Sequence, residues 1–188
     1  MTGAATPGPV TVRPERPGDA DGIRAVVRAA FPTAEESVLV DALRADPGAW
    51  IDGLSWVAVR DDENDDDDEA SRSGTGTIVG HALLTRCHVG RTPALCLAPC
   101  SVPPGLQGTG VGTAVTAAAL DAARAASEHL VVVLGHPTYY PRFGFERASP
   151  HGIRLSVEVP DEALMVLRLD PASPVPSGLV RYAPAFGI

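Results

Sequence analysis

The sequence predicts a mixed α/β fold in which a single central β-sheet is flanked by helices. Short apolar runs of strand length alternate with longer segments whose apolar residues recur with the period of a helix. One run, LVVVLG at 130–135, is continuously apolar, as is typical of a strand buried on both faces of a parallel sheet. The 188 residues are 45% hydrophobic and 20% charged, which suits one core. We expect one domain at 10–188, after a disordered leader at 1–9.

The expected elements are distinguished by the period of their apolar residues. In chain order they are a strand at 10–14, helices at 17–31 and 33–46, strands at 55–60, 77–90 and 93–102, a helix at 111–126, a strand at 130–135, a short helix within 136–145, and strands at 152–159 and 163–169. The apolar side expected for the helix at 111–126 comprises Val111, Ala114, Val115, Ala118, Ala122 and Ala126.

The first two helices carry start signals. Asp19 is placed to cap the first helix, whose apolar residues share one face. Thr33 and Glu36 have the three-residue spacing of a capping box at the start of the second helix.

An acidic run, DDENDDDDE at 61–69, separates the strands at 55–60 and 77–90. Adjacent like charges repel and resist burial, so we expect a flexible, solvated loop at 61–76. The run holds eight of the 23 acidic residues, and the other fifteen balance the fifteen basic ones. All basic residues are arginine and they are scattered, so the sequence argues against a nucleic-acid partner.

The cysteines and the N-terminus restrict the class of protein further. Cys87, Cys96 and Cys100 are odd in number and lack CxxC spacing, so neither a disulfide framework nor a structural metal site is expected. The N-terminus has no basic and apolar signal segment, and no apolar run reaches the length of a membrane span. We therefore expect a cytoplasmic protein without a membrane partner.

A glycine-rich turn follows the strand at 93–102. Pro99 lies inside that strand and cannot donate a ladder hydrogen bond, so we expect a bulge there. The next segment, SVPPGLQGTGVGTAVTAAAL, places Gly108, Gly110 and Gly112 before a helix. Glycines let the main chain approach a ligand closely, and a helix start supplies free N–H groups, so the pattern suits a phosphate. A tight turn without a ligand is the alternative.

Three phosphate-binding designs share such a turn. A P-loop needs a lysine, and the chain has none. A dinucleotide fingerprint needs a third glycine where Thr113 stands, and the next strand lacks the acidic residue that binds ribose. A third design, Gln107-x-x-Gly110-x-Gly112, binds a pyrophosphate through main-chain amides and needs no lysine.

Together with YYPRFGF at 139–145, the segment QGTGVG at 107–112 resembles the GNAT superfamily of acyl-CoA-dependent N-acetyltransferases. The first segment is similar to the superfamily's Q/R-x-x-G-x-G/A pyrophosphate loop, and the second to its aromatic-Tyr-x-x-x-Gly-Phe segment. The order of elements between Val10 and Leu169 is also similar. LGHPTYYPRFGF and the ending VRYAPAF resemble a widespread bacterial subgroup.

The resemblance implies that the sheet is splayed near Pro99 and that acetyl-CoA, the co-substrate, binds there. The turn amides would hold its pyrophosphate, and the strand before the turn would pair with its pantetheine arm. The implied contacts are Leu97, Cys100, Ser101, Val102, Gln107, Gly108, Thr109, Gly110, Val111, Gly112, Thr113 and Tyr140. Arg142 could reach a phosphate or cap a helix.

The resemblance also implies direct transfer of the acetyl group, with an amine attacking the thioester. Tyr140, four residues before Gly144, would protonate the departing thiolate, since phenols and thiols have ordinary pKa values of about 10 and 8.5. Tyr140 could instead serve packing, which is the role expected for Tyr139, Phe143 and Phe145.

The general base is not defined by the sequence. Glu36, beside Glu35 at the start of the second helix, and His136, after the strand at 130–135, are the candidates, and each could simply be solvated. Water could carry the proton as well. His81 on a central strand is more typical of a hydrogen-bonded core histidine, and an acyl-accepting Cys100 would contradict direct transfer.

We therefore predict an acetyl-CoA-dependent N-acetyltransferase that acts on an amine of a small molecule or a protein. A non-catalytic acyl-CoA-binding module and a nucleotide-binding oxidoreductase remain the alternatives. The sequence defines neither the acceptor nor the oligomeric state, of which a homodimer is one possibility.

Overall fold

The computed structural model describes residues 9–61 and 76–188. Most of the expected leader and of the expected acidic loop, residues 1–8 and 62–75, therefore lies outside the described residues. No helix in the described ranges combines the length and the apolar character needed to cross a bilayer.

The core of the molecule is a mixed β-sheet with the strand order β1-β2-β3-β4-β5-β8-β6. Its strands are β1 (Val10–Pro14), β2 (Ser55–Arg60), β3 (Thr77–Val89), β4 (Thr92–Ser101), β5 (Leu130–Leu134), β6 (Glu146–Arg147) and β8 (Leu164–Arg168). Neighbouring strands on this path are antiparallel except β4 and β5, which run parallel. Two short strands, β7 (Ile153–Arg154) and β9 (Gly178–Arg181), pair in parallel, and β9 also pairs with β3.

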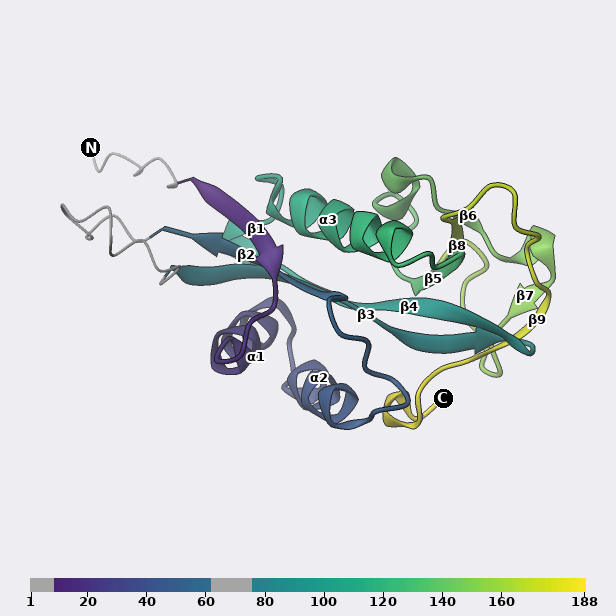
Figure 1. Cartoon of the computed structure of the whole chain (residues 1–188), viewed down its shortest axis with the longest axis horizontal. Helices are drawn as coiled ribbons and strands as arrows, with labels where there is room; N and C mark the ends of the chain where they lie inside the picture. The colour runs from purple at the N-terminus through teal and green to yellow at the C-terminus, as the bar shows by residue number, and fades with distance from the viewer. Residues whose placement is uncertain (1–8, 62–75) are drawn as a thin grey trace.

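Helices cover both faces of the sheet. Helices α1 (Ala20–Ala30) and α2 (Glu35–Ala45) lie on one face and α3 (Val111–Ala125) lies on the other (Figure 1). Short 3-10 turns complete the fold: η1 (Pro104–Leu106), η2 (Tyr140–Phe143), η3 (Ser149–His151) and η4 (Pro184–Phe186). The mixed α/β class predicted from the sequence is confirmed.

Two hydrophobic clusters hold these layers together. Ile23 and Val27 of α1 are fully buried with Leu43 of α2 against β2 and β3. On the other face, Val115 and Leu120 of α3 pack against the strands. Because the helices sit on opposite faces, an opening through the sheet would connect the α3 side with the α1–α2 side.

Both helix starts differ in detail from the predictions. Asp19 occupies the cap position of α1, but its carboxylate accepts hydrogen bonds from the Arg13 guanidinium at 2.6 Å and from the Arg16 amide at 2.7 Å. Helix α2 begins at Glu35, so Thr33 lies before the cap and its hydroxyl donates to the Glu36 carboxylate at 3.3 Å. The Thr33 hydroxyl also accepts the Glu35 amide at 3.4 Å, so it serves the start of the helix from one position before the cap, whereas the Asp19 carboxylate bonds to groups that precede its helix.

The buried side of α3 is rotated from the expected one. It comprises Val111, Val115, Thr116, Ala119, Leu120 and Ala123. Ala114 is exposed instead. The larger Leu120 side chain buries more apolar area than an alanine, and the Thr116 hydroxyl finds a partner in the Cys100 thiol at 3.1 Å, so these residues face the core.

The predicted strand at 152–159 is wrong beyond its first residues. Only Ile153–Arg154 forms a strand, and Val157 is 44% exposed. The sequence alternates there as a strand would, but a strand needs a partner, and β7 finds only β9. Strands β6 and β9 are too short to show a periodic pattern, and they were not predicted.

The expected bulge lies where Pro99 interrupts β4. Ala82 of β3 faces Cys100 of β4, but two residues further along β3 Leu84 faces Leu97, so β4 has one extra residue at Ala98–Pro99. Pairing between β4 and β5 is limited to Leu95 with Val131 and Cys96 with Val132. Beyond these pairs the two parallel strands separate, which splays the sheet at its centre.

Candidate active site

A cleft of about 900 Å³ lies at the splay between β4 and β5. Its walls come from four segments that are distant in sequence. These are the connection from α1 into α2, residues 97–102 of and after β4, the glycine turn that begins α3, and residues 134–142 after β5. The lining residues thus come both from α1 and α2 and from the start of α3, and Figure 1 shows these helices on opposite faces of the sheet.

The glycine turn leaves main-chain amides exposed at one end of the cleft. Gly108 and Gly110 have φ of +77° and +96°, and no atom lies within 4 Å of where a Cβ would be. Helix α3 begins just after Gly110, and the amide of Ala114 donates to the Gly110 carbonyl at 2.9 Å. The amides of Val111, Gly112 and Thr113 therefore occupy the open first turn of the helix, where an anion is stabilised.

Arg142 adds a positive charge to this end. Its guanidinium stacks on the Tyr139 ring at 4.4 Å, and its Nε donates to the Tyr139 carbonyl at 2.9 Å. One Nη lies 3.5 Å from the Thr113 hydroxyl, which places the charge beside the first turn of α3. Among the described residues that line the cleft, Arg142 is the one arginine.

Tyr140 lies in the middle of the cleft wall with only 8% of its surface exposed. Its ring meets those of Tyr139 and Phe145 edge-on, at centroid distances of 5.0 and 5.6 Å. Burial, together with the neighbouring Cys100 and Tyr139, raises the pKa of the Tyr140 phenol well above its usual range. The hydroxyl is therefore protonated at neutral pH and can donate a proton but cannot act as a resting base.

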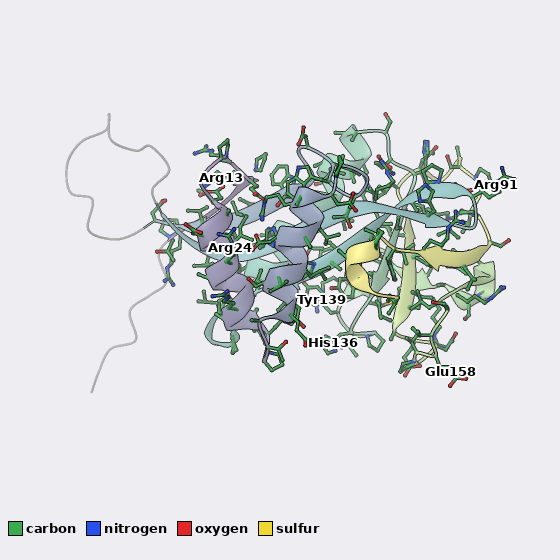
Figure 2. The ribbon with its side chains drawn as sticks, turned by 90° about the horizontal axis from the view of Figure 1, so that it is seen from below. Arg13, Arg24, Arg91, His136, Tyr139 and Glu158 are labelled. Carbon is green, nitrogen blue, oxygen red and sulfur yellow. The ribbon has the colours of Figure 1, made fainter. Side chains whose placement is uncertain are left out.

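Glu36 and His136 line the same cleft. Glu36 belongs to α2 and its carboxylate contacts the Thr33 hydroxyl. His136 follows β5 and is exposed, and its carbonyl accepts the amide of Tyr139 at 3.0 Å. Figure 2 labels His136 and Tyr139, which lie three residues apart in the segment after β5.

His81 lies in the core and does not line the cleft. It is fully buried, and its Nε2 lies 3.0 Å from the Ser55 hydroxyl. Burial, with a smaller contribution from Arg44, lowers the pKa of His81 to about 3. His81 is therefore a neutral core histidine, in agreement with the role that its sequence position favoured.

Cys100 faces the cleft, and its thiol contacts Thr116. Burial raises the pKa of this thiol. The thiolate form, which is the nucleophile, is thus disfavoured at this place in the cleft.

The structure brings most of the predicted site residues to the cleft. Its lining includes Glu36, Leu97, Cys100, Val102, Gln107, Gly108, Gly110, Gly112, Thr113, His136 and Tyr140. The side chains of three others do not line it. Ser101 is fully buried, Val111 packs in the core, and the Thr109 hydroxyl donates to the Leu106 carbonyl at 2.6 Å.

The sequence did not reveal the apolar part of the lining. Ala30 and Phe31 at the end of α1, Leu39 of α2 and Leu134 of β5 all border the cleft. Helical period marks such residues only as apolar, so it does not distinguish a cleft wall from the core. Among residues 9–61 and 76–188, no group of three His, Cys, Asp or Glu side chains could hold a metal ion.

Comparisons with known proteins follow the same arrangement. No protein-family model matches the chain. The uncharacterised N-acetyltransferase YhbS of Escherichia coli strain K12 is 32% identical over 174 residues, covering 91% of this chain and 95% of the relative. A second protein of that strain, the uncharacterised N-acetyltransferase YjhQ, is 35% identical over 149 residues, covering 77% and 74%.

Two solved structures are also similar. The structure of Escherichia coli YhbS, a GNAT family N-acetyltransferase in complex with CoA, matches with a TM-score of 0.80 at 28% identity, over 100% of this chain and 96% of that one. A GNAT family acetyltransferase from Brucella melitensis in complex with acetyl-CoA matches with a TM-score of 0.71 at 29% identity, over 95% and 98%.

Proposed function

Since the chain belongs to the GNAT family of acetyl-CoA-dependent N-acetyltransferases, we propose that its central cleft transfers the acetyl group directly to an amine, with Tyr140 as general acid. One observation carries this proposal: the same cleft joins the bare glycine turn, the splayed end of β4 and Tyr140. A donor held by the turn could therefore reach the phenol along the open edge of β4.

The glycine turn and the open edge of β4 suit the two parts of coenzyme A. The turn amides and the Arg142 guanidinium would bind the pyrophosphate, because each presents N–H groups and positive charge to the same space. The pantetheine arm carries amide groups, and β4 beyond Cys96 has lost its pairing with β5. Its main chain would pair with those amides as a neighbouring strand does.

The reaction requires a proton to reach the sulfur. The neutral amine attacks the thioester carbonyl carbon, a C–N bond forms, and the C–S bond breaks with both electrons leaving on sulfur. Tyr140 would donate its phenol proton to that thiolate. The burial that raises the pKa of Cys100 would also disfavour a bare thiolate here, so proton donation supports departure of the leaving group.

The attacking nitrogen must lose a proton, which returns to solvent or to the phenolate. Glu36 and His136 are placed to accept it, because both line the cleft and neither is paired with a cation among the described residues. A main-chain N–H at the bulge near Pro99 would stabilise the oxyanion that forms during attack.

The variant Tyr140→Phe tests the assignment of the acid. It keeps the ring and removes the proton, so we expect kcat to fall by about 100-fold or more while the Kd for coenzyme A is unchanged. Tyr182→Phe is the matched control, because Tyr182 is a half-buried tyrosine whose hydroxyl is buried and which does not line the cleft. Tyr140→Phe with an unchanged kcat would remove Tyr140 from the mechanism.

A further inference from the structure

The two ends of the cleft differ in charge. The end at the glycine turn carries Arg142 and the free amides of α3. The end at α1 and α2 carries Glu36, the one carboxylate among the described residues that line the cleft. An anionic ligand therefore fits the first end and a cationic one the second.

The α1–α2 end is otherwise apolar. Phe31 and Leu39 border it and belong to the hydrophobic cluster between the helices and the sheet. Leu134 at the end of β5 lines the same cleft and is 42% exposed, although the four residues before it in that strand are buried. An apolar side chain that stays open to a cleft offers area that a ligand can bury.

Glu36 keeps its charge available to a ligand. Its hydrogen-bond partner is the neutral Thr33 hydroxyl at 3.3 Å. Two arginines of the neighbouring helices are engaged elsewhere, since Arg24 pairs with Asp41 at 2.7 Å and Arg44 with Glu15 at 3.0 Å. The third, Arg28 of α1, is exposed and does not line the cleft. Among the described residues, no arginine lines this end, so a carboxylate on the acceptor would lack an arginine partner there and would be repelled by Glu36.

We propose that the acceptor is a primary amine on an aromatic or branched apolar skeleton that carries no carboxylate beside the amine. The inference rests on the proposed function, because it treats this end of the cleft as the place of the acceptor. Phe31, Leu39 and Leu134 contact the skeleton, and Glu36 attracts the ammonium form and repels acids. Free amino acids are therefore poor acceptors, and the corresponding decarboxylated amines are good ones.

Matched acceptors test the proposal. We would measure kcat/KM with acetyl-CoA for 2-phenylethylamine, L-phenylalaninamide and L-phenylalanine, and for isoamylamine and L-leucine. We expect each amine to exceed its amino acid by at least about tenfold, since like charges in a partly desolvated site cost that much discrimination. L-Phenylalaninamide has nearly the shape of L-phenylalanine without its charge, and we expect it to behave as the amines do.

The variant Glu36→Gln tests the origin of the preference. If Glu36 also accepts a proton, the variant lowers kcat/KM for the amine and for the amino acid alike. The ratio of the two kcat/KM values within one variant is therefore independent of that effect. We expect the ratio to shrink severalfold in Glu36→Gln and to stay unchanged in Glu35→Gln. Glu35 is the neighbouring exposed carboxylate and does not line the cleft.

The outcomes separate this inference from the proposed function. Coenzyme A that fails to raise the melting temperature would overturn both. If coenzyme A binds, three results would overturn the acceptor class alone. They are a higher kcat/KM for L-phenylalanine or L-leucine than for the matching amine, an unchanged ratio in Glu36→Gln, and no acetylation of any of the five compounds.

Discussion

Gly135 allows Tyr140 its place in the cleft wall, and the variant Gly135→Ala tests that arrangement. A Cβ built on Gly135 would lie 2.3 Å from Cε2 of Tyr140, 3.1 Å from Cδ2 and 3.2 Å from Cζ. Ordinary contacts begin near 3.4 Å. Gly135 has no positive φ, so an alanine is compatible with its backbone and the ring is what must move.

The expected magnitude follows from these distances. Restoring an ordinary contact requires a shift of about 1 Å, and the ring is held edge-on between Tyr139 and Phe145. Overpacking of this kind costs about 1–3 kcal/mol of unfolding free energy. A catalytic group displaced by about 1 Å loses about 100-fold in rate, so we expect kcat to fall by that order.

Urea unfolding and steady-state release of coenzyme A thiol measure the two effects. Gly105→Ala is the matched control, because its Cβ would meet nothing within 4 Å. In a Tyr140→Ala background the added methyl group has no ring to displace, so Gly135→Ala should there be neutral or stabilising, which gives a coupling energy of at least about 1 kcal/mol. Gly135→Ala with wild-type stability and kcat, or with equal effects in both backgrounds, would refute the proposed contact.

Two further outcomes are expected. Gly110→Ala and Gly187→Ala both force alanine into a left-handed conformation, at φ of +96° and +72°, so each variant should lose about 1–2 kcal/mol of unfolding free energy. Of the two, only Gly110 lines the cleft, so only Gly110→Ala should weaken coenzyme A binding, as measured by calorimetry. The depressed pKa of His81, about 3, means that the unfolded chain binds a proton below pH 6.5 that the native protein does not, so stability falls as pH falls. His81 should therefore account for a loss of about 2 kcal/mol of unfolding free energy between pH 7.5 and pH 5. In urea unfolding, His81→Leu should lack this pH-dependent loss, whereas the control His129→Asn, at an exposed histidine, should retain it.

The parts of the fold that the sequence predicted well are those encoded locally. Strands β1 and β2 have the predicted bounds, because a run of alternating or continuous apolar residues needs no further information. The bulge in β4 was predicted because proline cannot donate a ladder hydrogen bond wherever its partner lies. The strand predicted at 152–159 failed because its pattern lacked a partner, which the sequence does not show.

The same division applies to the site. The glycine turn and Tyr140 are contiguous motifs, and both line the cleft. Phe31 and Leu39 reach it because α1 and α2 pack on the face opposite α3, which depends on contacts with strands that are distant in sequence. The predicted cap of α1 was wrong for a similar reason. The Asp19 carboxylate accepts a hydrogen bond from Arg13 of β1 instead of from the amides of its own helix.

The position of the Tyr140 phenol is fixed by hydrogen bonds that extend from the sheet. Strand β5 pairs with β8 from Leu130 to Leu134, and the Gly135 amide continues the ladder to the Ala163 carbonyl at 2.9 Å. The Tyr139 amide then donates to the His136 carbonyl at 3.0 Å, which closes the turn before Tyr140. Because β5 also pairs with β4 just before the splay, one strand positions the phenol relative to the open edge of β4. The proposed separation of binding at the glycine turn from proton donation at Tyr140 therefore depends on the hydrogen-bonded end of β5, and Gly135 is the residue at which that end leaves room for the ring.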